Sequence, residues 1–171
     1  ISNPRSDRRP IEAVWYTGKL MGKAVAHNIC LEPVAYDPGI WYNSAKFFDI
    51  EYQVYGNIPT TLPENIVTLY WQHPSEPKAI RINYESLSKT VTGFNLMGIR
   101  YRHKVCEKWI QDKTSIEEVL QNLSLANFDP EFFREYEEEL VKLYNKQEGT
   151  NFTLKKKRRL GLVEKFLRIE N

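Results

Sequence analysis

Residues 66–84 read IVTLYWQHPSEPKAIRINY. Two runs rich in β-branched and aromatic residues, 66–73 and 78–84, flank the turn-forming segment PSEP at residues 74–77. Such runs, bounded by Pro and Ser, are typical of strands, and the short segment between them indicates a β-hairpin. We therefore expect an antiparallel hairpin near the centre of the chain.

Further strands are predicted on both sides of this hairpin. Residues 48–55 alternate, which predicts a half-buried strand. Residues 90–96 supply a fourth candidate, and the short connections between successive strands favour an antiparallel meander. The faces of the first strand carry Phe48, Ile50, Tyr52 and Val54 on one side and Asp49, Glu51, Gln53 and Tyr55 on the other.

Helical signals follow the strands. Tyr101, Val105 and Trp109 lie four apart, and residues 115–118 fit a capping box. Asp129 and Pro130 predict the start of a helix. That helix would carry Phe133, Tyr136, Leu140 and Tyr144. Together with a helix near the start, this order predicts an α+β fold with an N-terminal helix, an antiparallel sheet of four to five strands, and C-terminal helices packed on the sheet.

The N-terminal helix is expected over residues 11–29, with Pro10 near its first turn. Its apolar stripe is Val14, Met21, Val25 and Ile29, and Gly18 and Gly22 lie in the same stripe. Each glycine costs about 1 kcal/mol relative to Ala in a helix interior, so close approach of another group is the expected compensation. Packing of another backbone is the plainer interpretation, and a flat ligand is the alternative.

Composition excludes several classes of function. The chain has 171 residues, which suits one domain, and its net charge of +2 gives no global reason to expect nucleic acid. Two cysteines, Cys30 and Cys106, are too few and too far apart for a disulfide scaffold, which favours a cytoplasmic location. Residues 1–10 lack an initiator Met and any periodicity, which predicts the interior of a longer protein.

No self-contained catalytic constellation is found, and we assign no catalytic residue and no metal ligand. The sequence has no GxGxxG, and GKLMGK at residues 18–23 departs from the spacing of a phosphate-binding loop. His27, His73 and His103 have no partner at metal-ligand spacing and are expected to be surface or capped histidines. Asp49 and Glu51 are expected to be solvated.

Two segments carry a family resemblance. Residues 9–28 (RPIEAVWYTGKLMGKAVAHN) resemble the helix after the second flavin-contacting Gly-Asp motif in NAD(P)H-dependent flavoproteins related to ferredoxin reductases and NADH oxidases, that is, FAD-dependent pyridine nucleotide-disulfide oxidoreductases. The Gly-Asp itself would lie upstream of Ile1. The matching positions are Glu12, Ala13, Val14, Trp15 and Gly18.

Residues 40–56 (IWYNSAKFFDIEYQVYG) resemble the family's aromatic-aromatic-Ser stretch leading into the first strand of its C-terminal domain. Asn43 departs from the pattern, and residues 46–50 hold one apparent extra residue. Residues 92–98 and 115–128 are similar to the family's last strand and helical finish. The matching positions in the second segment are Tyr42, Ser44, Phe47, Gln53 and Gly56.

The resemblance implies a C-terminal interface domain that covers FAD and supports dimerisation, inactive in isolation. The implied division is residues 1–30 after the FAD domain, 31–150 as the interface domain, and 151–171 as a basic and apolar tail. FAD and NAD(P)H would belong to the full-length protein, with neither bound to this fragment. The implied partners are the missing N-terminal FAD and NAD(P)H domains, a second copy in a homodimer, and a redox protein.

Site residues follow from the resemblance alone. Glu12, Ala13 and Val14 would lie near the pyrimidine end of the flavin, where helix amides stabilise negative charge. Trp41, Tyr42, Lys46 and Phe47 would face the isoalloxazine, with plain core packing as the alternative for the aromatics. Thiol chemistry through a His-Pro motif is disfavoured, because the chain has Phe128, Asp129 and Pro130 there.

Two alternatives stay open. The chain could instead be a stand-alone α+β module that binds protein or nucleic acid, although Asp49 and Glu51 would repel phosphate. The tail contains KKKRR at residues 155–159 followed by apolar residues. Docking of this tail on its own domain is the favoured interpretation, and attachment to a membrane surface or to a redox partner are the others.

Overall fold

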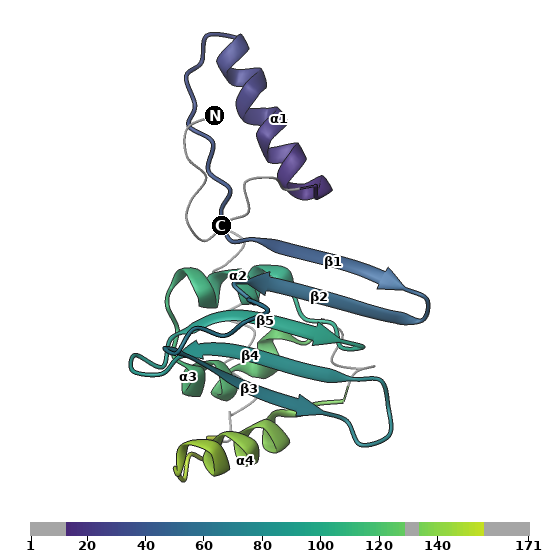
Figure 1. The fold of residues 1–171 in the computed structure, drawn as a ribbon, viewed down its shortest axis with the longest axis vertical. Coiled ribbons are helices and arrows are strands. Elements are labelled where there is room, and N and C mark those ends of the chain that lie inside the picture. Colours follow the sequence, from purple (N-terminus) through teal and green to yellow (C-terminus); the bar gives the residue numbers. More distant parts are fainter. Residues whose placement is uncertain (1–12, 129–133, 156–171) are drawn as a thin grey trace.

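The central hairpin is confirmed in a computed structural model, which describes residues 13–128 and 134–155. Strands β3 (Ile66–Gln72) and β4 (Ala79–Glu85) pair antiparallel, with Leu69 opposite Ile82. Strand β5 (Val91–Met97) pairs with β4, and β1 (Tyr42–Phe47) pairs with β2 (Ile50–Gly56). The five strands form one antiparallel sheet in the order β1-β2-β5-β4-β3 (Figure 1).

The predicted meander holds for β3, β4 and β5 but not for the first two strands. Strand β2 pairs with β5 rather than with β3, so the segment between β2 and β3 crosses to the far edge of the sheet. Strand β1 was expected only as a lead-in to a strand. Its sequence YNSAKF has too little apolar alternation to predict a strand by itself, and pairing with β2 makes it one.

The alternation of apolar residues in β2 predicts that Ile50, Tyr52 and Val54 face the core. The structure instead buries the opposite face of the strand. Gln53 and Tyr55 are buried towards the helices, whereas Phe48 lies in the β1–β2 turn at φ 51° and is 83% exposed. Gln53 Oε1 accepts from the backbone N of Tyr101 at 2.8 Å. Because this hydrogen bond replaces one to water, it lowers the cost of burying the Gln53 amide oxygen.

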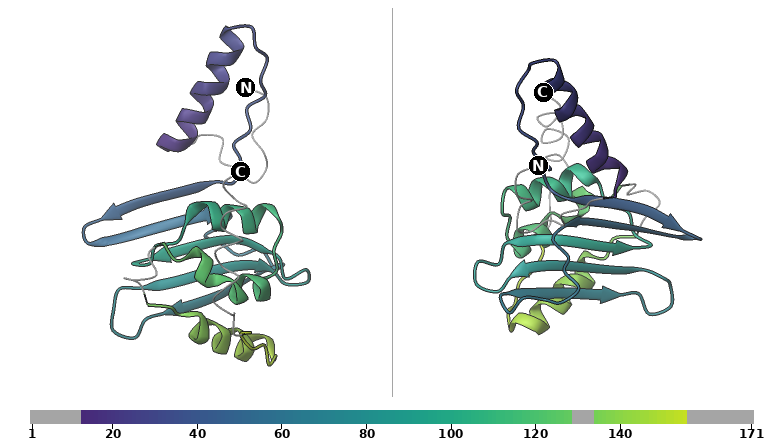
Figure 2. Two further views of the ribbon diagram at one scale, coloured as in Figure 1. Left: turned by 180° about the vertical axis from the view of Figure 1, so that it is seen from behind. Right: turned by 45° about the horizontal axis from the view of Figure 1, so that its top comes forward.

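The helices cover one face of this sheet, as the view from behind shows (Figure 2). They are α2 (His103–Gln111), α3 (Ile116–Gln121), the 3₁₀ turn η1 (Leu123–Ala126) and α4 (Glu137–Glu148). The capping box is confirmed, since Ser115 Oγ accepts from the Glu118 amide at 3.2 Å. Helix α4 begins at Glu137, later than predicted, and residues 129–133 lie outside the described part.

The core lies between the sheet and these helices. Leu69, Ile80, Ile82, Phe94 and Leu96 from the sheet meet Ile116, Leu120, Leu140 and Tyr144 from the helices, all almost completely buried. Phe152 and Leu154 pack against the edge of this core. The opposite face of the sheet has no helix on it in the described residues, and there Tyr70 and Met97 are exposed.

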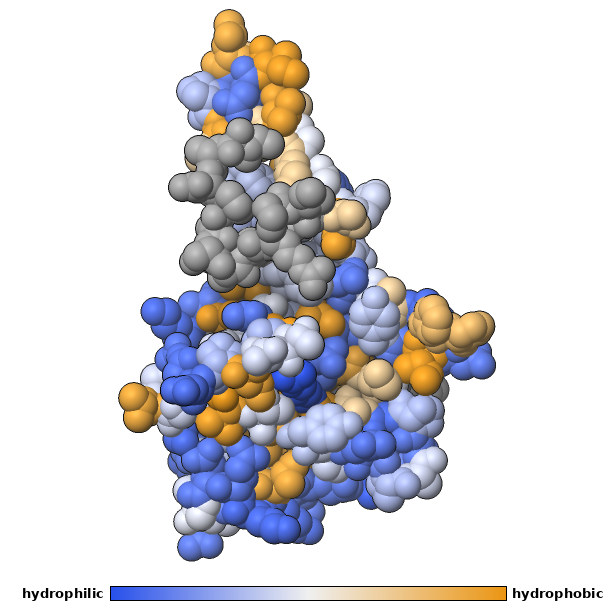
Figure 3. All heavy atoms as spheres, viewed as in Figure 1, coloured by the Kyte–Doolittle hydropathy of each residue, from blue (hydrophilic) through white to orange (hydrophobic). Residues whose placement is uncertain are grey.

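Helix α1 (Trp15–Ile29) projects away from this body (Figure 1). It meets the sheet at its first turn, where the ring centroids of Tyr16 and Tyr42 are 4.5 Å apart. Trp15 is 70% exposed and Ile29 is 75% exposed, and hydrophobic residues gather among hydrophilic ones at the projecting end of the molecule (Figure 3). No helix in the described residues is long and apolar enough to cross a membrane.

Candidate functional site

An aromatic cluster lies where the first turn of α1 meets the start of β1. The Tyr42 ring is 4.5 Å from the Tyr16 ring and 3.9 Å from the His103 imidazole, measured between centroids. The His103 ring is also stacked on Tyr55, at 5.5 Å with the planes 5° apart. We call Tyr16, Tyr42, Tyr55 and His103 the Tyr42 cluster. It joins α1, β1, β2 and α2 at one point.

The environment predicted for His103 from the sequence was wrong. Rather than being at the surface or capped, it is half-buried between two tyrosines at the start of α2. Burial lowers the pKa of the His103 imidazole, which keeps the ring neutral near pH 7. Within the described part of the chain its Nε2 has no hydrogen-bond partner, and the Glu107 carboxylate is 4.0 Å away.

Tyr42 and Tyr55 also remain neutral. Burial, followed by the neighbouring Tyr16 and Glu107, raises the pKa of the Tyr42 hydroxyl above its ordinary value. Burial likewise raises the pKa of Tyr55 strongly, and its hydroxyl donates to the Tyr101 carbonyl at 3.2 Å. Tyr42, Tyr55 and His103 therefore present uncharged rings at neutral pH.

The N-terminus of α1 lies beside the Tyr42 cluster. Val14 is the N-cap residue in extended conformation, and its side chain makes no capping hydrogen bond. The Thr17 hydroxyl donates to the Val14 carbonyl at 2.9 Å, which ties the first turn together. First-turn amides carry the positive end of the helix dipole and favour an anionic or electron-rich group.

The structure brings some of the predicted site residues together and separates others. Ala13 and Val14 directly precede the first turn of α1, and Tyr42 contacts that turn through Tyr16. Trp41, next along the chain, is half-buried, and its carbonyl accepts from the Gly56 amide at 2.7 Å. Glu12 lies outside the described residues.

Lys46 and Phe47 lie at the other end of β1 from Tyr42. Four or five residues of strand separate them from Tyr42, a distance of roughly 13–17 Å. Both are exposed, and Phe47 packs edge-on against Phe48 at 4.7 Å between centroids. A single flat ligand against the Tyr42 cluster would therefore contact Tyr42 but not the hairpin end.

Tyr16, Tyr55 and His103 were missed as candidates. Tyr16 directly follows the matched residue Trp15, so its place in the first turn was the one available signal. Tyr55 was expected on the face that the apolar residues leave open. His103 joins the cluster only because α2 packs on β2, and no spacing in the sequence indicates that contact.

The described residues of this site lack groups suited to metal binding or thiol chemistry. The described residues hold no group of three or more His, Cys, Asp or Glu side chains able to bind a metal ion. Cys106 is fully buried, and burial raises the pKa of its thiol well above the ordinary value, so it is unreactive. Stacking on a planar ring, exclusion of water and hydrogen bonding from helix amides are what the cluster can supply.

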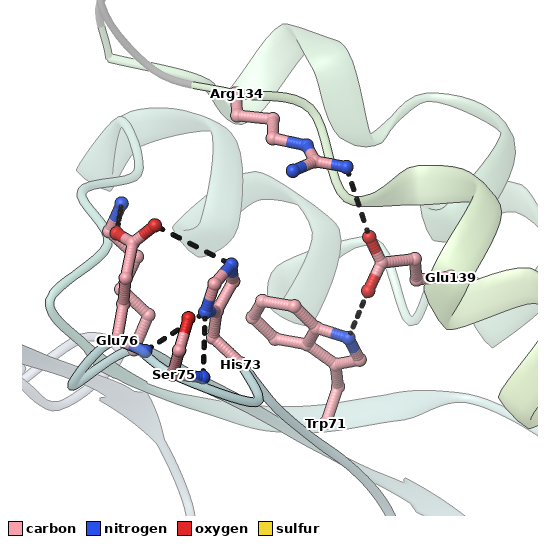
Figure 4. Close-up of polar contacts among 7 residues, drawn as sticks. Trp71, His73, Ser75, Glu76, Arg134 and Glu139 are labelled. Carbon is pink, nitrogen blue, oxygen red and sulfur yellow. Dashed lines mark hydrogen bonds and ion pairs between the residues drawn. The ribbon is translucent and has the colours of Figure 1, made fainter.

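A second polar cluster, at the end of β3, has a structural role (Figure 4). Trp71 Nε1 donates to Glu139 at 2.8 Å, and Arg134 lies 3.7 Å from the same carboxylate, which joins β3 to α4. His73 Nδ1 accepts from the backbone N of Glu76 at 3.0 Å. This confirms His73 as a histidine that caps a turn, here the one between β3 and β4.

Comparison with known proteins adds a fold likeness. No protein-family model and no curated protein matches the chain. Eight chains of solved structures match, among them an NAD-dependent persulfide reductase from A. fulgidus with a TM-score of 0.51 and 19% identity. The match covers 75% of this chain but only 26% of that protein, so the chain spans about a quarter of its length. At this identity the likeness shows a shared fold.

Proposed function

We propose that this chain is the C-terminal part of an FAD-dependent NAD(P)H oxidoreductase, in which residues 31–150 form the interface domain. Residues 13–30 would then be the last helical element of the preceding FAD domain. The domain would cover the flavin and take part in dimerisation, and would not be catalytic in isolation. Electrons would pass from the nicotinamide to the flavin and onward to an acceptor or redox partner protein.

The observation that carries this proposal is the exposure of α1. The helix has 15 residues, and Trp15, Val25 and Ile29 on it are each more than half exposed. An isolated helix of this length is marginal in water, and exposed large apolar side chains usually mark a contact surface. A Cβ added at Gly18 or Gly22 would meet nothing within 4 Å. Both features are accounted for if α1 completes a domain that precedes residue 13.

The Tyr42 cluster fits the edge of a flavin. FAD, when bound, would supply a ring that accepts hydride and takes on negative charge when reduced. The first-turn amides of α1 would stabilise that charge, and the short side chain of Ala13 would leave room for the ring. Tyr42, held between Tyr16 and His103, would shield one side from water.

The fit is limited to one end of the cofactor. The chain has no glycine-rich turn for a pyrophosphate, so the parts that anchor FAD would belong to the preceding domains. Lys46 and Phe47, at the far end of β1, would not touch the ring that Tyr42 covers. The likeness to a quarter of a larger NAD-dependent enzyme supports a domain that works as one part of such a protein.

The test compares this chain with the product of the complete open reading frame. We expect the 171-residue chain to be folded and colourless, without NAD(P)H oxidation, and the complete protein to carry flavin absorbance. Stoichiometric flavin bound to the chain alone would contradict the role of a cover. A complete protein that binds no flavin, or an open reading frame without dinucleotide-binding domains, would contradict the proposal as a whole.

A further inference from the structure

A pocket of about 370 Å³ lies on the face of the sheet that the helices leave open. Tyr70, Arg81 and Asn95 lie side by side across β3, β4 and β5 in the strand register and line it together. We call it the open-face pocket. Its polar lining is Thr68, Arg81 and Asn95, and its apolar lining includes Leu62, Tyr70 and Met97.

Arg81 is held in this pocket by a buried amide. Its Nε donates to Asn83 Oδ1 at 3.2 Å, and the Thr68 hydroxyl donates to the same oxygen at 2.8 Å. Asn83 is completely buried, so it fixes the base of the guanidinium. Within the described residues the Asn83 Nδ2 has no hydrogen-bond partner, which is uncommon for a buried polar atom.

Among the described residues, the outer nitrogens of the same guanidinium have no acidic partner. No ion pair of Arg81 is found in residues 13–128 and 134–155, and no Asp or Glu lines the pocket. A half-buried arginine beside apolar side chains is normally matched by a carboxylate or phosphate, because its planar fork accommodates two oxygens at once. The pocket therefore presents an oriented cation, and the described residues supply no counter-ion to it.

The residues that line the open-face pocket indicate which class of anion would bind there. One guanidinium, with no lysine and no second arginine in the lining, matches a single negative charge, whereas a phosphate dianion usually takes more than one cation. The apolar lining on the other side suits a hydrocarbon or aromatic body. The volume lies at the small end of ligand pockets, which are commonly about 300–1,000 Å³.

We propose that the open-face pocket is a binding site for a small monocarboxylate with an aromatic or aliphatic body. The carboxylate is held bidentately by Arg81, and the body packs between Tyr70, Met97 and Leu62. Asn83 acts as a positioning residue that sets the plane of the guanidinium. The inference stands on this face alone and does not rest on the cofactor proposed above.

Benzoate is the probe, titrated into the 171-residue chain and followed by NMR. We expect saturable shifts of the Arg81 Nε–H and of the Asn83 and Asn95 side-chain amides, with a dissociation constant of about 1 mM. Arg81→Lys keeps the positive charge but removes the planar guanidinium that binds a carboxylate through two hydrogen bonds. It should weaken benzoate binding about tenfold. Acetate, which lacks the aromatic ring of benzoate, should bind the unchanged chain more weakly than benzoate does.

Arg134→Gln is the matched control, because this arginine is exposed and lies outside the open-face pocket. It should leave benzoate affinity unchanged, and thermal melts of both variants verify that the fold is intact. Shifts that do not saturate, inorganic phosphate binding as tightly as benzoate, or equal affinity in folded Arg81→Lys would each overturn the proposal. None of these outcomes involves flavin, so failure here is distinct from failure of the proposed function.

Discussion

The double variant Gly18→Ala, Gly22→Ala distinguishes a helix that stands alone from one that packs against a preceding domain. Ala is better than Gly in a helix interior by about 1 kcal/mol per site. A Cβ at either position meets nothing within 4 Å among the described residues, so we expect the new methyl groups to cause no clash in the isolated chain. The variant should therefore stabilise α1 by about 2 kcal/mol, roughly 30-fold in its helix–coil equilibrium.

Circular dichroism at 222 nm and NMR secondary shifts of residues 15–29 measure this gain in the isolated chain. Helical signal should rise, while the melting temperature of the sheet and its helices should change little, because α1 meets the sheet at its first turn. Lys23→Ala is the control on the same helix. Lys23 is exposed, so its effect on helix content should be small and equal in every context.

In the complete protein the same two methyl groups should be harmful. If the glycine strip is covered by a preceding domain, overpacking costs about 1–3 kcal/mol at each site. The free-energy change in the complete protein should then be about 2–6 kcal/mol less favourable than in the isolated chain, with reduced flavin content. Equal stabilisation in both proteins, with flavin retained, would refute the reasoning that α1 belongs to a larger domain.

Three further predictions concern strand β1, His103 and Glu148. In the complete protein, Tyr42→Ala should change the rate of flavin reduction in stopped-flow, whereas Phe47→Ala, 68% exposed at the far end of β1, should leave flavin spectra unchanged. The folded-state pKa of His103 is lowered from 6.5, so stability is complete above that pH and falls as the pH drops through it. In the isolated chain, His103→Phe should flatten the melting temperature between pH 7 and pH 5. Glu148, whose pKa is lowered by Lys89 and then by the Tyr84 hydroxyl, stabilises the fold above its ordinary pKa of 4.5. Glu148→Gln should cost about 1.5–3 kcal/mol in urea unfolding at pH 7, and the difference from the unchanged chain should shrink in acid.

The fold class was predictable because its signals are local. The β3–β4 hairpin follows from two apolar runs around PSEP, and the start of α3 follows from Ser115 and Glu118. Strand order was not predictable, because pairing of β2 with β5 depends on contacts between residues far apart in the chain. The buried face of β2 was also hidden, since Gln53 is buried by virtue of one hydrogen bond to the Tyr101 backbone.

Individual site residues were harder to predict than elements. The family resemblance named positions along two segments, and it treated residues 41–47 as one surface. These residues form the extended strand β1, in which each residue adds about 3.3 Å of length. Tyr42 and Phe47 are therefore too far apart to contact the same small ligand. Tyr16 and His103 became visible only when α1 and α2 were placed against β1 and β2.

Glycine provides the strongest link between sequence and proposed function. A residue that costs helix stability is expected to gain something from close approach, and Gly18 and Gly22 gain nothing in the part of the chain that the structure describes. Gly56 and Gly93 show the opposite case, because a Cβ there would come within 3 Å of backbone oxygens. In the sheet the reason for each glycine lies within the domain. For α1 we propose that the reason lies in a surface that covers the helix, as a preceding flavin domain would.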